Sequence, residues 1–211
     1  FSFLISLLIF QIGSAQYWQQ AVDYTMEVSL DTDTALYNGT QKIVYTNNSP
    51  ETLHKVFYHL YFNAFKPGSE MAVRLKNAAD KNRRFKIDVD SLTLDQQGYL
   101  KVKGLTQDGV LLSPVDSETI LEVPLNQPIP PGGSTTFELS FEGQIPPVIR
   151  RAGKNSSEGV AFSMAQWYPK MAEYDREGWN ADPYTGREFH GVWGDFDVKI
   201  TLNKKFVVAA S

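Results

Sequence analysis

Apolar and polar residues alternate with a period of two over most of the chain, and this period predicts β-strands. Between residues 24 and 30 the apolar positions are Tyr24, Met26, Val28 and Leu30, with polar residues between them. A strand with this pattern turns one face to a core and the other to solvent. The same reasoning predicts strands at 42–47, 53–62, 99–103, 119–125, 135–142 and 196–203.

Turn-forming residues separate the predicted strands. The stretches 47–50 and 128–133 combine Asn, Pro and Gly, which break strands and favour turns. Residues 87–94 and 99–103 are expected to form a hairpin, and 71–79 to contain at most a short helix. Eight or more strands at this spacing predict an all-β fold, either an antiparallel β-sandwich or an open barrel.

The first fifteen residues have a different composition. Residues 1–10 are almost wholly apolar, and small residues follow at 13–15. This pattern is typical of a secretory signal peptide, with cleavage expected between Ala15 and Gln16. We therefore expect a truncated signal peptide at 1–15, export to the periplasm or the outside of the cell, and one domain at 16–211. The final residues, 206–211, resemble a strand that stops midway, so we expect the domain to be cut there.

Composition and charge exclude several classes of partner and site. The chain has 211 residues, a net charge of −4 and no cysteine. This mild charge gives no reason to expect nucleic acid as a partner, and the short basic run at 81–86 is expected to be a solvated loop. Without cysteine there is no disulfide, no thiolate zinc site and no lipoprotein anchor at the cleavage site. The apolar N-terminal stretch is shorter than the about 20 residues of a membrane span, so we expect no stable membrane anchor.

Few residues suit catalysis or metal binding. Of the three histidines, His54 and His59 share a predicted strand but should point to opposite faces, which favours a structural role. The chain contains no His-Glu-x-x-His motif, nucleophile elbow or glycine-rich phosphate loop. Four carboxylates at 173–182 could bind calcium, but their spacing does not match an EF-hand and a solvated loop is favoured. The chain is therefore expected to contain no catalytic residue and no metal ligand of its own.

The segment 160–197 is unusually rich in both aromatic residues and glycines. Aromatic side chains bury large areas, and glycines allow close backbone approach. A long irregular connection of this kind indicates either a functional loop or a small second core, and composition alone does not decide between them.

Within this segment, residues 162–171 (FSMAQWYPKM), 173–175 and 178–179 resemble the end of the N-terminal domain of aminopeptidase N-like zinc metallopeptidases. The similarity is closest to an exported bacterial branch. Residues 191–198, 24–31, 39–47 and 58–65 are also similar to that branch, so the resemblance extends over roughly 17–211.

This resemblance implies a function for the chain and for one residue. It implies the N-terminal, substrate-anchoring β-sandwich domain of an enzyme that removes N-terminal residues from peptides. Zinc and the catalytic residues would belong to the parent protein's own downstream catalytic domain, so this fragment alone should be inactive. In the family this domain contributes a Gln or Glu that binds the free α-amino group of the substrate, and the matching residue is Gln166. Trp167 and Tyr168 would be its neighbours, as walls of the site or as core.

Two other interpretations remain open. The chain could be a stand-alone exported carbohydrate- or peptide-binding module, with Trp167, Trp179 and Trp193 as a stacking platform. It could also belong to a family member that has lost its zinc ligands and serves as a scaffold.

Overall fold

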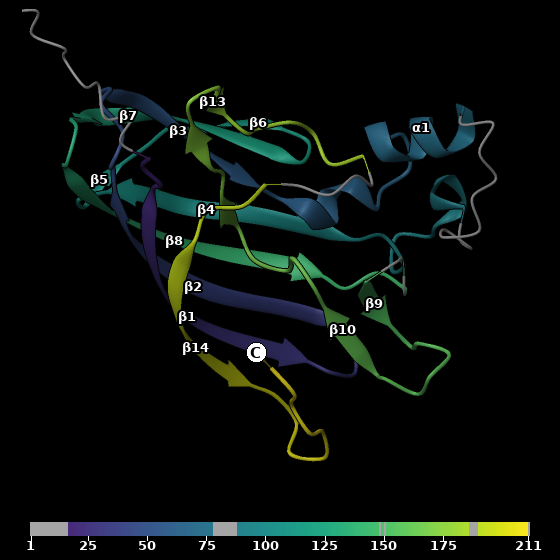
Figure 1. The fold of residues 1–211 in the computed structure, drawn as a ribbon. Helices are drawn as coiled ribbons and strands as arrows, with labels where there is room; N and C mark the ends of the chain where they lie inside the picture. The colour runs from purple at the N-terminus through teal and green to yellow at the C-terminus, as the bar shows by residue number, and fades with distance from the viewer. Residues whose placement is uncertain (1–16, 78–87, 148, 150, 186–189, 211) are drawn as a thin grey trace, which may run out of the picture.

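Two β-sheets that face each other make up most of the fold (Figure 1). The computed structural model describes residues 17–77, 88–147, 149, 151–185 and 190–210. The predicted signal peptide at 1–15 and the basic run at 81–86 lie outside these residues. Among those described, the fold is all-β with a single α-helix, which confirms the predicted sandwich.

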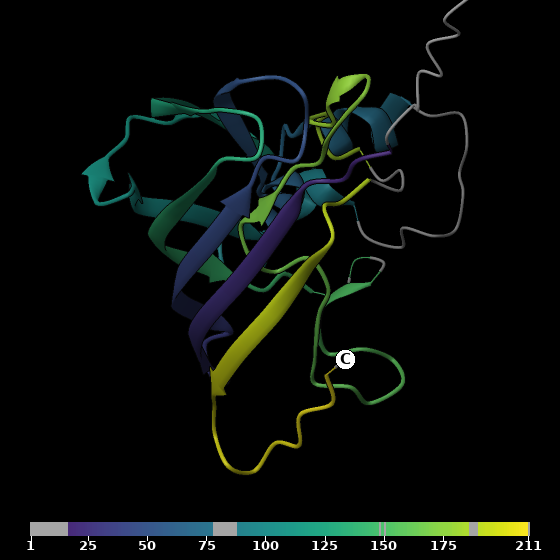
Figure 2. The same cartoon turned by 60° about the vertical axis from the view of Figure 1, so that its left-hand side comes forward.

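The larger sheet contains the longest strands. Every second residue of β1 (Ala21–Asp31) is buried, as its sequence alternation predicts. Neighbouring strands in this sheet are antiparallel, with the exception of β14 (Gly194–Thr201), which runs parallel to β1 (Figure 2). The predicted antiparallel arrangement therefore holds for the other pairs of this sheet, and the parallel pair lies at its edge. In spatial order the strands are β14 (Gly194–Thr201), β1 (Ala21–Asp31), β2 (Leu36–Thr46), β8 (Ser134–Gln144), β4 (Tyr99–Gln107) and β5 (Val110–Leu111).

The smaller sheet covers part of the larger one. Its order is β11 (Lys170–Met171), β3 (Leu53–His59), β7 (Ile120–Ile129) and β6 (Val115–Ser117). The predicted strand at 53–62 ends earlier, because the chain turns into the 3-10 helix η1 (Tyr61–Ala64). All four residues of η1 are buried, so the apolar run continues into the core without extending the sheet.

The core lies between the two sheets. Tyr58 of β3 and Phe137 of β8 meet edge to face across it, with ring centroids 6.4 Å apart. One continuous cluster of buried apolar side chains joins both sheets, and the largest fully buried members include Tyr24, Tyr37 and Phe141. Burial of this aromatic surface is the main term that stabilises the fold.

The hairpin predicted at 87–94 and 99–103 is wrong. Residues Val89–Ser91 form a short 3-10 helix, η2, and the Asp88 carboxylate caps it by accepting the backbone N–H of Asp90 (3.1 Å). Strand β4 pairs instead with β8, which offers a much longer partner. The short helix expected at 71–79 is confirmed for the described residues as α1 (Glu70–Asn77).

Two short hairpins complete the described chain. One is β9 (Ala152–Lys154) with β10 (Phe162–Met164), and the other is β12 (Tyr174–Asp175) with β13 (Gly178–Trp179). Between them the chain passes from the large sheet to the edge of the small one. None of the helices described is long and apolar enough to cross a membrane.

Candidate functional site: the Gln166 loop

Residues 165–169, which we call the Gln166 loop, connect β10 to β11. The loop ends where Met171 pairs with Tyr58 of β3 and Lys170 with His59. It thus leads directly into the edge of the smaller sheet. The side chains that hydrogen-bond to the loop, or to the backbone just after it, belong to β1 and β2 and lie on the face of the larger sheet that points toward the core.

Three buried side chains bind the backbone at and just after the loop. The Tyr37 hydroxyl donates to the carbonyl of Trp167 (2.6 Å), and the Gln41 Nε2 donates to the carbonyl of Pro169 (2.9 Å). The N–H of Met171 donates to the hydroxyl of Tyr24 (3.0 Å). A buried hydrogen bond is costly to break, because the group left behind is no longer solvated. The backbone from 167 to 171 is therefore fixed against the sheet.

Gln166 stands immediately before this fixed stretch. Its backbone has φ = 61°, in the left-handed region that residues other than glycine seldom adopt. The residue is half-buried. Within the described chain its carboxamide makes no hydrogen bond, although it carries one acceptor and two donors. A strained backbone next to an unused polar group is a common feature of binding sites.

Trp167 and Tyr168 pack against the core and both keep part of their surface exposed. The Trp167 ring lies 6.1 Å from Tyr37, and the Tyr168 ring lies 5.6 Å from Tyr24 and 5.9 Å from Phe196. Burial raises the pKa of Tyr168 to about 12, so its hydroxyl remains protonated at neutral pH. The sequence left open whether these rings are walls or core, and the structure places both rings on the core beside Gln166.

The sequence pattern does not identify Tyr24, Tyr37 and Gln41 as residues that support the loop. Their partners at the loop or just after it lie 128 to 147 positions away, a separation that no local pattern reveals. One signal was available for Gln41, since it is a polar residue at an inward position of β2. A buried amide needs partners, so it marks a place where another segment must approach.

The chain has weak similarity to M1 zinc metallopeptidases of known structure. The enzyme from Deinococcus radiodurans matches 71% of this chain and 27% of its own, with 14% identity and a TM-score of 0.43. The values are the same for its mutant bound to a Tyr-Ser-Ala substrate. A two-domain mutant bound to L-tryptophan matches 72% of this chain and 28% of its own, again with 14% identity and a TM-score of 0.43.

This chain spans about a quarter of the length of those structures. At these values the similarity does not assign it to the family. No protein-family model and no curated protein matches the sequence.

The histidines lie in different environments. His54 is exposed, whereas His59 is buried and its Nε2 lies 3.0 Å from the carbonyl oxygen of Asn180. Burial lowers the pKa of His59 to about 4, so its ring is neutral at pH 7. In the part of the chain that the structure describes, no three His, Asp or Glu side chains come together as a metal site. The described residues therefore offer no set of ligands that fits zinc.

The carboxylates at 173–182 differ from the expected solvated loop. Glu173 is only 2% exposed, and burial raises its pKa. Asp175 accepts hydrogen bonds from Asn180 Nδ2 (2.9 Å) and from the N–H of Glu177 (2.8 Å). Only Glu177 and Asp182 are exposed as predicted. The buried Glu173 and the half-buried Asp175 belong to the compact turn that carries β12 and β13.

The tryptophans proposed as a stacking platform have separate surroundings. Trp167, within the Gln166 loop, packs on the core against Tyr37, and Trp179 packs against Phe57 and Tyr174. Trp193 is 72% exposed and precedes β14. None of the ring contacts among the described residues joins two of these three side chains.

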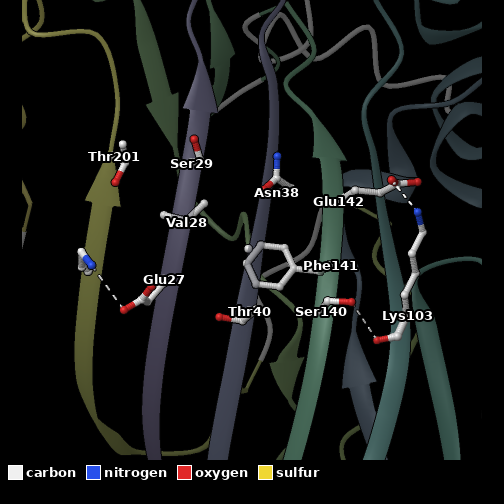
Figure 3. Close-up of a pocket in the computed structure, with 12 residues that line it drawn as sticks. Glu27, Val28, Ser29, Asn38, Thr40, Lys103, Ser140, Phe141, Glu142 and Thr201 are labelled. Carbon is white, nitrogen blue, oxygen red and sulfur yellow. Dashed lines mark hydrogen bonds and ion pairs between the residues drawn. The ribbon is translucent and has the colours of Figure 1, made fainter.

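A shallow groove of about 450 Å³ crosses the outer face of the larger sheet (Figure 3). Its walls are two ion pairs, Lys199 with Glu27 (3.4 Å) and Lys103 with Glu142 (2.7 Å). Small polar side chains lie between them: Ser29, Asn38, Thr40, Ser140 and Thr201. Since these residues point outward and Tyr37 points inward, the groove and the Gln166 loop lie on opposite faces of the larger sheet. The charged side chains of the groove already pair with each other, which leaves a ligand few charged groups to bind.

Proposed function

We propose that this chain is the N-terminal, substrate-anchoring domain of an exported zinc-dependent aminopeptidase. The observation that carries the proposal is the unused carboxamide of Gln166, held in a left-handed backbone next to a fixed stretch of chain. The sequence resemblance at 162–171 supports the same residue. Export would depend on the signal peptide predicted at 1–15.

Gln166 suits recognition of a peptide's free N-terminus. Its carboxamide oxygen would accept a hydrogen bond from the α-ammonium group, and such charge-assisted bonds are stronger than neutral ones. A half-buried position strengthens the interaction further, because less water screens it. Glutamine provides this acceptor without a charge, so binding at this residue would not depend on its own ionisation.

Catalysis would come from the other part of the proposed enzyme. Zinc, when bound there, would polarise the scissile carbonyl and activate a water. The described residues of this chain contain no such metal site, so their contribution is binding and orientation. The 211-residue chain by itself is expected to release no amino acid from a peptide.

The edge formed by β14 provides apolar surface for the proposed downstream catalytic domain. Phe196 and Ile200 point to the same side of the sheet as the core residues of β1, yet they are 47% and 40% exposed. Trp193, just before the strand, is 72% exposed. Exposed apolar groups of this size, close together in sequence, are typical of an interface.

Extending the reading frame beyond Ser211 tests the domain assignment. We expect a His-Glu-x-x-His motif and a third glutamate ligand in the continuation. A stop codon directly after Ser211 would contradict the proposal, and a continuation with broken zinc ligands would support the scaffold interpretation instead.

Gln166→Ala in the complete peptidase is expected to raise KM for alanine p-nitroanilide about tenfold, with little change in kcat. The loss of one hydrogen bond to a charged group accounts for this factor. Steady-state kinetics of purified enzymes measures it. Gln127→Ala is the matched control, because that exposed side chain makes no hydrogen bond among the described residues. An unchanged KM in Gln166→Ala would refute the role of Gln166.

A further inference from the structure

The hydroxyl of Tyr37 links the core of the sandwich to the Gln166 loop. Tyr37 is 1% exposed and lies on the inward face of β2. Its hydroxyl donates to the carbonyl of Trp167 over 2.6 Å, one peptide unit after Gln166. Burial raises the pKa of this phenol well above its usual value, so the group remains a donor at every physiological pH.

Gly143 of β8 makes room for this hydroxyl. The two residues are directly paired across β2 and β8, and Tyr37 extends over the glycine. A Cβ atom at position 143 would lie 2.2 Å from Cζ of Tyr37 and 2.3 Å from its hydroxyl oxygen. Because real Cβ atoms do not approach other atoms this closely, any other residue at 143 would push the ring away from Trp167.

Three aromatic rings set the direction of the Tyr37 ring. Phe62 lies 6.1 Å away, Phe141 6.3 Å and Trp167 6.1 Å, each in an edge-to-face arrangement. Such packing leaves a buried ring few alternative rotamers. Phe62 and Phe141 lie outside the Gln166 loop, so they orient the hydroxyl independently of that loop.

We infer that Tyr37, seated over Gly143, is a positioning residue for Gln166. Its hydrogen bond fixes the peptide unit between Trp167 and Tyr168, one residue beyond Gln166, and so restrains the chain that leaves the unfavourable left-handed backbone of Gln166. Without the bond, Gln166 relaxes toward ordinary backbone angles and its carboxamide is no longer held in place. The effect on substrate rests on the proposed function, whereas the effect on the loop does not.

Tyr37→Phe removes the hydroxyl and keeps the ring. Hydrogen–deuterium exchange of the 211-residue chain, followed by mass spectrometry, is expected to show roughly tenfold faster exchange at 166–171, the factor that one lost hydrogen bond gives. Exchange in β1, β2 and β8 should stay the same. Tyr45→Phe is the matched control, because the Tyr45 hydroxyl lies buried on the same face of β2 and has no partner within the described residues. Unchanged exchange at 166–171 in Tyr37→Phe would overturn the inference.

Gly143→Ala provides an independent variant, because it displaces the hydroxyl instead of removing it. We expect the same local increase in exchange at 166–171. Protection of this segment equal to that of the unmodified chain would count against the inference.

A double-mutant cycle in the complete peptidase tests the effect on substrate binding. Tyr37→Phe should raise KM for alanine p-nitroanilide about threefold to tenfold when Gln166 is present, and leave it unchanged in a Gln166→Ala background. An equal increase in both backgrounds would mean that Tyr37 acts independently of Gln166 and would overturn the positioning role. If Gln166→Ala alone leaves KM unchanged, the proposed function fails, and the exchange experiment still decides whether Tyr37 fixes the loop.

Discussion

Replacing Asn47 by alanine is expected to lower the free energy of unfolding by roughly 3–5 kcal/mol. The side chain is fully buried, and its Nδ2 group donates to the carbonyls of Glu51 (2.7 Å), Ile129 (3.0 Å) and Pro130 (3.2 Å). Its Oδ1 atom accepts the N–H (3.1 Å) and the hydroxyl (2.7 Å) of Ser49. One amide thus joins the turn after β2 to the turn before β8, and its loss leaves several buried groups without partners.

Urea denaturation of purified variants measures this loss. Asn48→Ala is the matched control, because this neighbouring side chain makes one exposed hydrogen bond, to the carbonyl of Gln19 (2.9 Å). Asn47→Asp distinguishes the contribution of the donor Nδ2 from that of the acceptor Oδ1. A carboxylate keeps the acceptor but places negative charge against three carbonyl oxygens. If Asn47→Ala costs no more than Asn48→Ala, the buried network contributes little to stability.

His59 is expected to make the fold less stable as the pH falls. Burial lowers its folded-state pKa from 6.5 to about 4, with smaller opposing contributions from Asn180 and Asp182 and a lowering one from Lys170. Between these two pH values the unfolded chain binds the proton and the folded chain does not. The contribution of His59 to the free energy of unfolding is therefore complete above pH 6.5 and is lost as the pH falls to 4. The total loss is about 3 kcal/mol.

His59→Gln removes this titration, and its side-chain amide can still donate to the carbonyl of Asn180. We expect the drop in unfolding free energy between pH 7 and about 4.5 to shrink by about 2–3 kcal/mol in this variant. His54→Gln, at an exposed position of the same strand, should leave the drop unchanged. An identical pH dependence in His59→Gln and the unmodified chain would show that His59 is not responsible.

Local patterning predicted the strands that have one solvated face. The alternation at 24–30 and 135–142 reappears as β1 and β8, because each strand has its own polar face and its own inward face. The strand predicted at 42–47 begins earlier in the structure, because Asn38 and Thr40 are polar residues on the outer face of β2 and the residue between them is a glycine. The hairpin at 87–103 was wrong because β4 pairs with β8 nearly forty residues later, and pairing partners are not encoded in local periodicity.

Only one residue of the candidate site, Gln166, was predicted from the sequence, and the side chains that support it were not. Gln166 came from the resemblance of its surrounding sequence, and no periodicity singles it out. Its supports, Tyr37 and Gln41, belong to β2 and are brought to the loop by the packing of the two sheets. Whether Trp167 and Tyr168 are core or wall depends on the same packing. Contacts of this range are set by tertiary structure, which composition and spacing do not specify.

The pairing of β14 with β1 has a consequence for how the chain folds. Glu27 and Lys199, which meet across this pair, are separated by 172 positions. Contacts this distant in sequence form slowly, because a long loop must close before they are gained. The hairpin of β1 and β2 can form early, and until β14 docks, the backbone groups along the free edge of β1 are available to other chains. Refolding yield should therefore fall as protein concentration rises.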